Sequence, residues 1–270
     1  MLRQEVMIEK VRDLCERDDR LIGALMYGSF AFGEGDEFSD VEFYLFFRDD
    51  ALDRVDEEGW VSRIAPLSLY YVNEFGNGTA IFEDLVRGEF HFEAVSDVGL
   101  VEAWEVVRFP SLEAAVLVDK DGELSRSMGR LVGPPTDPDT LEQVLFLCNG
   151  LVNWTLMGSN LLERGELARA EAFLTLLHSH LLRAARLVEG ATINWLSPSR
   201  RLEEDLSPAS CERFRACTAA LDAGQLRRAY RSAWSWGREL IACLSERHTF
   251  ELPEDLLAKM DRRVERASRT

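Results

Sequence analysis

Residues 21–47 read LIGALMYGSFAFGEGDEFSDVEFYLFF. The hydrophobic runs at the two ends of this stretch have the length and composition of buried strands. Gly28 and Ser29 form a small turn directly after the first run, and two acids, Asp40 and Glu42, introduce the second. The stretch therefore predicts two covered strands, with a pair of carboxylates at the start of the second strand.

Asp40 and Glu42 are two positions apart, so both side chains point to the same face of a strand. Their Cα atoms would lie roughly 7 Å apart, where two like charges repel by about 2 kcal/mol at an effective dielectric constant near 20. A proton, a basic partner or a metal ion has to offset this repulsion. Oxygen ligands at this spacing suit Mg²⁺, which usually shares its coordination shell with water and substrate phosphates. The alternative is an ordinary solvated strand start.

The Gly28-Ser29 turn indicates phosphate binding when it is considered together with the acids. Glycine allows a phosphate to approach the backbone closely, and Ser29 offers a hydroxyl and an amide donor. A helix beginning at this turn would add further amide donors. Ordinary turn chemistry explains a lone Gly-Ser pair equally well, but the whole stretch predicts amides for a triphosphate and carboxylates for its magnesium ion.

The composition limits the class of protein. The chain has 270 residues, and 46% of them are hydrophobic, which predicts a sizeable folded core. A formal net charge of -17 argues against non-specific binding to a nucleic-acid backbone. The N-terminus lacks the pattern of a secretory leader, and the longest uncharged stretch, Leu21 to Gly33, is too short to span a membrane. We expect a cytoplasmic protein that binds neither nucleic acid nor a membrane.

The five cysteines are scattered and form no C-x-x-C pair. Neither a disulfide framework nor a zinc site is therefore predicted, and buried free thiols are expected. The cysteines are Cys15, Cys148, Cys211, Cys217 and Cys243.

The best boundary within the chain is the proline-rich stretch VGPPTDPDT at 132–140. Before it the patterns are mixed, and we predict strands at 21–28, 40–47, 67–75, 79–86, 88–95 and 114–119 and helices at 3–18 and 53–64. After it only helical periodicity remains, at 140–164, 167–189, 208–222, 224–247 and 253–267. We expect an α/β domain at 1–132 and a helical domain at 138–270, packed together across a cleft.

The chain resembles a known superfamily and, within it, one family. Gly28-Ser29, a spacer of ten residues and the run Asp40-Val41-Glu42-Phe43 resemble the signature of the polymerase-β-type nucleotidyltransferases. Over nearly the whole chain the sequence is similar to the lincosamide nucleotidyltransferases, antibiotic-inactivating enzymes of bacteria. Four segments carry this similarity: MYGSFAFGEGD (26–36), IFEDLVRGEFHF (81–92), LVNWTLMGSNLLERGELAR (151–169) and NWLSPSRRLEEDLS (194–207).

The resemblance implies an α+β fold, in which a nucleotidyltransferase-type mixed sheet with flanking helices is followed by a C-terminal helical bundle. It implies Mg²⁺-dependent transfer of a nucleoside monophosphate, AMP from ATP, to a hydroxyl of lincomycin or clindamycin, with release of pyrophosphate. It also implies a homodimer, in which the N-terminal domain is catalytic and the helical domain serves acceptor binding and dimerisation.

In such a reaction a substrate hydroxyl attacks the α-phosphorus, and magnesium neutralises charge on the phosphoryl oxygens and the leaving group. Asp40 and Glu42 are predicted to be the catalytic metal ligands, and Gly28 and Ser29 to bind the nucleotide. Glu89 is predicted to be the general base, because the family places a third acid on a neighbouring strand. Alternatively, Glu89 could be a further ligand of the metal ion.

The alternating stretch RGEFHFE puts Glu89, His91 and Glu93 on one strand face. Arg87 is predicted to reach the triphosphate, with an ordinary surface ion pair as the alternative. Tyr44, His91 and Glu93 are predicted to contact the acceptor. His91 could instead be catalytic, or it could only form a hydrogen bond in the wall of the site. Glu93 could simply face solvent.

Other polar groups receive structural interpretations. Asp119, ahead of a Lys-Asp-Gly sequence, is interpreted as a turn-initiating acid. His178 and His180 lie two apart on a predicted helix, so they do not face together and are poor joint ligands. The tryptophans of the helical half, Trp154, Trp195, Trp234 and Trp236, are expected mostly in the core, with one or two in an acceptor pocket.

Three rival functions stay open. An aminoglycoside nucleotidyltransferase would use the same chemistry on a polycationic acceptor, which the net charge of -17 suits. A nucleotidyltransferase that modifies a partner protein, as in some toxin-antitoxin pairs, would keep the N-terminal site and change the acceptor. A nucleotide-binding module without catalysis is disfavoured by the complete set of Asp40, Glu42 and Glu89.

Overall fold

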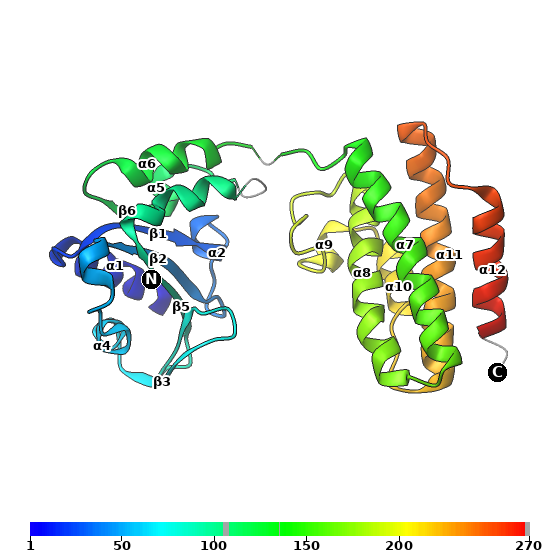
Figure 1. The fold of residues 1–270 in the computed structure, drawn as a ribbon, viewed down its shortest axis with the longest axis horizontal. Coiled ribbons are helices and arrows are strands. Elements are labelled where there is room, and N and C mark those ends of the chain that lie inside the picture. Colours follow the sequence, from blue (N-terminus) through cyan, green and yellow to red (C-terminus); the bar gives the residue numbers. More distant parts are fainter. Residues whose placement is uncertain (105–107, 135, 268–270) are drawn as a thin grey trace. The chain divides into compact units, whose positions relative to one another are not determined.

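The computed structural model describes residues 1–104, 108–134 and 136–267. The chain divides into two compact units, Met1–Thr136 and Asp137–Thr270 (Figure 1). Each unit has a hydrophobic core of its own. Pro135 of the predicted linker and residues 268–270 of the predicted helical domain lie outside the described residues.

The N-terminal unit is built on a six-stranded sheet with the strand order β3-β4-β5-β2-β1-β6. Its strands are β1 (Leu21–Tyr27), β2 (Val41–Phe47), β3 (Leu67–Val72), β4 (Gly78–Phe82), β5 (Arg87–Ala94) and β6 (Val116–Asp119). β2 and β5 run parallel, whereas the other neighbouring strands run antiparallel. The predicted mixed sheet is confirmed.

The hydrophobic run of β2 is covered on both faces of the sheet. Phe43 and Leu45 point to one face and are fully buried, and Phe46, which points to the other, is 2% exposed. Strands that are apolar on both sides are typical of the covered centre of a sheet. Asp40 and Glu42 therefore lie at the start of a buried strand.

Helix α1 (Arg3–Arg17) packs against β1, β2 and β6. Val11 and Cys15 are buried, as the helical spacing predicts. Val6 was expected on the same face but is 50% exposed, and Met7 is buried in its place. The face that runs through Val11 at intervals of three and four residues includes Met7 and not Val6.

Short helical segments connect the strands. They are α2 (Gly28–Ala31), α3 (Asp49–Leu52), α4 (Glu57–Val61), α5 (Leu112–Ala115) and α6 (Glu123–Met128), with the 3₁₀ segments η1 (Val95–Ala103) and η2 (Gly129–Leu131). The predicted helix over 53–64 is wrong in its extent, because only α4 is helical there. Asp56 caps α4 by accepting from the backbone N–H of Gly59, so the acids start a new helix.

Three predicted strands are shorter than expected by two residues or more. The strand predicted over 114–119 begins at Val116, because Ala114 and Ala115 belong to α5. The strand predicted over 67–75 ends at Val72, where the backbone N–H of Asn73 donates to the carbonyl of Asn77 and closes a turn. The strand predicted over 79–86 ends at Phe82, and the chain then turns through Leu85, which has a φ of 65°.

The C-terminal unit is helical, and every strand of the described residues lies in the N-terminal unit. Its helices are α7 (Leu141–Glu163), α8 (Leu167–Glu189), α9 (Leu202–Asp205), α10 (Pro208–Ala216), α11 (Ala223–His248) and α12 (Glu254–Ala267). The long helices α7, α8 and α11 pack side by side, and α12 contacts α7 and α11 (Figure 1). The predicted bundle is confirmed, although the helix predicted over 208–222 ends at Ala216.

The tryptophans of the helical unit belong to its core, as predicted. Trp234 and Trp236 are buried, and Trp154 and Trp195 pack against the core while partly exposed. All five cysteines are free, and four are buried, but the expectation of a buried thiol is wrong for Cys243, which is exposed. Among the helices of the described residues, none is long and apolar enough to cross a membrane.

Arg186 holds the segment between α8 and α10 in place. Its side chain is fully buried, and its guanidinium donates to the carbonyls of Ala191, Pro198 and Arg200. It also pairs with the carboxylate of Asp205 at 2.8 Å. Removing one partner of a buried pair leaves the other charge uncompensated, so Arg186 is a major contributor to the stability of this unit.

The substitution Arg186→Met is expected to lower the free energy of unfolding of the helical unit by about 3–5 kcal/mol. Denaturant unfolding followed by circular dichroism measures the loss. Arg213→Met is the control, because Arg213 pairs with Glu239 at the surface and exposed pairs contribute about 1 kcal/mol or less. Equal losses in the two variants would contradict the role given to Arg186.

Candidate active site

The strand register brings together residues that are far apart in the sequence. In the parallel pair of β2 and β5, Glu42 lies opposite Glu89 and Tyr44 lies opposite His91. In the antiparallel pair of β1 and β2, Tyr27 lies opposite Glu42. Because directly opposite residues of neighbouring strands share a face of the sheet, Tyr27, Glu42 and Glu89 form one row across three strands.

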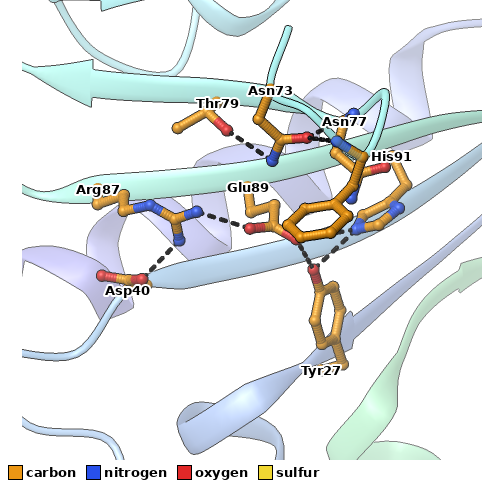
Figure 2. Close-up of polar contacts among 9 residues, drawn as sticks. Tyr27, Asp40, Asn73, Asn77, Thr79, Arg87, Glu89 and His91 are labelled. Carbon is orange, nitrogen blue, oxygen red and sulfur yellow. Dashed lines mark hydrogen bonds and ion pairs between the residues drawn. The ribbon is translucent and has the colours of Figure 1, made fainter. Parts of the chain in front are cut away.

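Arg87, at the start of β5, links two of the predicted acids (Figure 2). Its Nη1 donates to Oδ2 of Asp40 at 2.6 Å, and its Nη2 donates to Oε2 of Glu89 at 2.7 Å. Burial works against the charge of Arg87, but the bonds to Glu89 and Asp40 raise its pKa above the ordinary value. Arg87 is thus a permanently charged basic partner that offsets the repulsion among the acids.

Both carboxylate oxygens of Glu89 accept hydrogen bonds. Oε2 accepts from Arg87, Oε1 accepts from the hydroxyl of Tyr27 at 2.9 Å, and Nε2 of His91 lies 3.2 Å from Oε1. Burial opposes the ionisation of Glu89, but the bonds from Arg87 and Tyr27 outweigh it and hold the pKa of Glu89 below its usual value. Glu89 is therefore ionised at neutral pH, as a proton acceptor has to be.

His91 is buried beside Glu89, and Tyr44 stacks on it. The two ring centroids lie 3.8 Å apart with an angle of 17° between the planes. Burial lowers the pKa of His91 in spite of the nearby Glu89, so the imidazole is neutral at pH 7. Glu93 continues the same face of β5 and is partly buried, and burial together with Asp97 raises its pKa. Of the three predicted acceptor residues, Tyr44 and His91 are thus in direct contact.

Gly28 lies against the carboxylate of Glu42. Its φ of 71° is in the left-handed region that favours glycine, and a Cβ added at this position would overlap Oε2 of Glu42. Ser29 follows it in α2. The predicted turn and the second predicted acid therefore meet in the folded chain.

The substitution Gly28→Ala is expected to cost about 1–2 kcal/mol of stability from the left-handed backbone. It is also expected to lower the catalytic rate about 10²-fold, because it displaces the carboxylate of Glu42. Gly33→Ala is the matched control, since Gly33 has the same φ of 71° and no described atom lies within 4 Å of its added Cβ. Thermal unfolding and initial rates distinguish the two effects. A control variant that loses as much rate as Gly28→Ala would contradict the steric explanation.

The helical unit is similar to a known protein family. Residues 140–263 match the family model described as "lincosamide nucleotidyltransferase-like, C-terminal domain". The matched segment covers most of the C-terminal unit. The match confirms the resemblance seen in the sequence, and it does so on the part of the chain that lacks the predicted acids. The match also confirms the predicted enzyme class, a nucleotidyltransferase.

Two solved structures are similar to this chain at low identity. An aminoglycoside 6-adenyltransferase from Bacillus subtilis is 13% identical, with a TM-score of 0.46 and 100% of each chain covered. A nucleotidyltransferase-like protein from Exiguobacterium sibiricum is 15% identical, with a TM-score of 0.38, covering 97% of this chain and 89% of that one. No curated protein matches the sequence.

A magnesium ion, which the lincosamide nucleotidyltransferase resemblance implies, fits the chemistry of the acids. Among the described residues, no group of three or more His, Cys, Asp or Glu side chains is placed to hold a metal ion. Magnesium needs no such cage, because it is usually bound by one or two carboxylates and by substrate phosphates. Asp40 and Glu42 are donors of this kind, and the Asp40 side chain is 37% exposed and so accessible from solvent.

Sequence reasoning did not include Tyr27, Thr79 and Asn73 among the residues of the candidate site. Thr79 on β4 lies opposite Glu89, is buried, and pairs with Nδ2 of Asn73 at 3.2 Å (Figure 2). The place of Thr79 depends on strand pairing, which no spacing in the sequence signals. For Tyr27, the one indication in the sequence that it lies near the candidate site is its position directly before Gly28.

The structural interpretations of the other polar groups are confirmed. Asp119 accepts from the backbone N–H groups of Gly122 and Ser125, as a turn-initiating acid does. His178 and His180 bond to different backbone carbonyls, those of Cys217 and Leu176. They therefore form no joint ligand pair.

Proposed function

We propose that the protein transfers AMP from ATP to a hydroxyl of a lincosamide such as lincomycin or clindamycin, in a magnesium-dependent reaction that releases pyrophosphate. The observation that carries the proposal is the arrangement of acids on β2 and β5. Glu42 lies opposite Glu89, and Arg87 joins Glu89 to Asp40. Carboxylates for a divalent ion beside a guanidinium for a phosphate are what a bound triphosphate requires.

Each residue has a role in the proposed reaction. The magnesium ion, when bound, neutralises charge on the phosphoryl oxygens and the leaving pyrophosphate. Asp40 and Glu42 hold this ion, and the Gly28-Ser29 turn receives the phosphates. Arg87 exchanges the carboxylate of Asp40 for a phosphate oxygen, since guanidinium groups bind either partner through the same donors.

Glu89 takes the proton of the attacking hydroxyl. It suits this task because it is ionised at neutral pH and lies directly opposite Glu42, one of the proposed metal ligands. The proton acceptor is then adjacent to the site where the phosphoryl group is held. An acceptor hydroxyl that lies over β2 and β5 would contact Glu89 and the bound phosphoryl group at once.

The family match of the helical unit favours a lincosamide as the acceptor. Tyr44, His91 and Glu93 stand on the acceptor side of Glu89 in this proposal. Aromatic faces and an acid suit a drug with an apolar sugar-and-amine body and an ammonium group. An aminoglycoside is the second candidate, because the net charge of -17 favours a polycationic acceptor.

Mass spectrometry after incubation with Mg²⁺, ATP and clindamycin or lincomycin tests the proposal. We expect the drug to gain the mass of one AMP group, and we expect a chelator to prevent the gain. Aminoglycosides run in parallel assess the second acceptor class. Modification of an aminoglycoside alone would overturn the lincosamide assignment. No modification of either class, with nucleotide still bound, would contradict the proposed function.

A further inference from the structure

We infer that Tyr27 is a positioning residue whose hydroxyl holds the Glu89 carboxylate in the orientation from which it takes the acceptor proton. This inference rests on the proposed function, and it concerns a residue of β1 that stands outside the acid pattern. Figure 2 shows the hydroxyl of Tyr27 directed at Glu89 and His91. The three side chains come from two strands that are not neighbours, β1 and β5, with β2 between them.

Tyr27 and Arg87 hold different oxygens of the same carboxylate. The hydroxyl of Tyr27 donates to Oε1 of Glu89 at 2.9 Å, and Nη2 of Arg87 donates to Oε2 at 2.7 Å. An ionised carboxylate accepts about four hydrogen bonds, two on each oxygen. Among the described residues, Tyr27 and His91 contact Oε1, and Arg87 donates to Oε2. Oε2 therefore keeps a lone pair for the proton of an acceptor hydroxyl.

The hydroxyl of Tyr27 is itself fixed in direction. Nε2 of His91 lies 2.8 Å from the hydroxyl oxygen of Tyr27. Because this hydroxyl donates to Glu89, the imidazole must donate to it, which places the proton of the neutral His91 on Nε2. Tyr44 stacks on His91 and lies with its ring centroid 5.3 Å from that of Tyr27. Tyr27 thus reaches Glu89 from a packed strand and not from a loop.

Loss of the Tyr27 hydroxyl is expected to lower the rate of the chemical step and to leave substrate binding unchanged. Without the hydroxyl of Tyr27, Oε1 of Glu89 loses its closest donor and the carboxylate can rotate about its last bond. A reacting group that is displaced by about 1 Å costs about 10²-fold in rate. Phenylalanine at position 27 keeps the ring and its packing, so the substitution removes only the hydrogen bonds.

A double-mutant cycle with Tyr27→Phe and Glu89→Gln tests the inference in the full-length protein. Tyr27→Phe is expected to lower kcat by about 10- to 100-fold and to leave KM for both substrates within about twofold. In the Glu89→Gln background the same change is expected to alter kcat by less than about twofold, because the group that it positions is already lost. Equal losses in the two backgrounds, or no loss in either, overturn the inference.

Tyr70→Phe is the matched control for this cycle. It also removes a tyrosine hydroxyl that donates to a glutamate of the same unit, Oε2 of Glu57 at 2.7 Å. Tyr70 belongs to β3 and takes no part in the proposed reaction. Its kcat is expected to equal that of the wild type, so a loss in Tyr70→Phe equal to that in Tyr27→Phe overturns the specific role of Tyr27.

Nuclear magnetic resonance of the four histidine side chains provides a readout that does not depend on turnover. Tyr27→Phe and Glu89→Gln are each expected to shift the ring-nitrogen signals of His91, whereas Tyr70→Phe leaves them in place. A wild-type protein that modifies no acceptor ends the proposed function and, with it, the catalytic part of the inference, whereas the His91 signals test separately whether the Tyr27 hydroxyl holds Glu89 and His91. Unshifted His91 signals in Tyr27→Phe overturn the inference even if the wild type is active.

Discussion

Asp40→Asn is expected to lower the rate of AMP transfer by about 10³-fold, which corresponds to about 4 kcal/mol of activation free energy. Asparagine keeps the shape of the side chain but removes the negative charge that a magnesium ion requires. The fold should survive, because the Asp40 side chain is partly exposed and Arg87 keeps its bond to Glu89. Initial rates at saturating Mg²⁺ and ATP measure the loss.

Asp50→Asn is the matched control for this experiment. Asp50 is an exposed aspartate of the same unit that pairs with Arg48 and Arg54, much as Asp40 pairs with Arg87. Its substitution is expected to leave the rate within about twofold, because exposed ion pairs contribute little. If Asp40→Asn kept a rate near that of the wild type, Asp40 would not be a metal ligand.

Glu89→Gln is expected to lower kcat by about 10²- to 10⁴-fold, the usual contribution of a positioned general base. Glutamine keeps an acceptor for the hydroxyl of Tyr27 but cannot take a proton at neutral pH. KM for both substrates should change little, because the proton moves only in the transition state. Glu57→Gln is the control, since Glu57 also accepts from a tyrosine hydroxyl, that of Tyr70, outside the candidate site.

A magnesium titration of Glu89→Gln separates the two roles left open for Glu89. If Glu89 is the base, the Mg²⁺ concentration that gives the half-maximal residual rate stays unchanged. If Glu89 completes the metal shell, this concentration rises. We predict no change, because the positively charged guanidinium of Arg87 already lies against Oε2 of Glu89 and disfavours a second cation there. A Glu89→Gln variant with the full wild-type rate would exclude both roles.

The central strands could be predicted because each carries its own local signal. β2 is hydrophobic on both faces and β5 alternates, and the observed bounds differ by one residue at each end or less from 40–47 and 88–95. The helix expected over 53–64 could not be predicted correctly, because its acids suit a helix interior and a helix start equally well. The helix begins where it does because the side chain of Asp56 accepts a hydrogen bond from the backbone N–H of Gly59. Such a contact cannot be read from amino-acid composition.

The candidate site could be predicted only where its residues are neighbours in the sequence. Gly28, Asp40 and Glu42 belong to one short segment, and Glu89 followed from the resemblance. The contact of Tyr27 with Glu89 and the bond of Arg87 to Asp40 depend on how β1, β2 and β5 pair. Strand pairing joins distant segments, and a single sequence carries no direct signal for it.

A crystal structure with Mg²⁺ and a non-hydrolysable ATP analogue tests the central claim most directly, namely that the acids beside Gly28 hold a magnesium ion and its polyphosphate. We predict an ion coordinated by Asp40 and Glu42, phosphates against the Gly28-Ser29 turn, and Arg87 moved from Asp40 to a phosphate oxygen. A nucleotide bound elsewhere, with Arg87 still paired to Asp40, would contradict the claim.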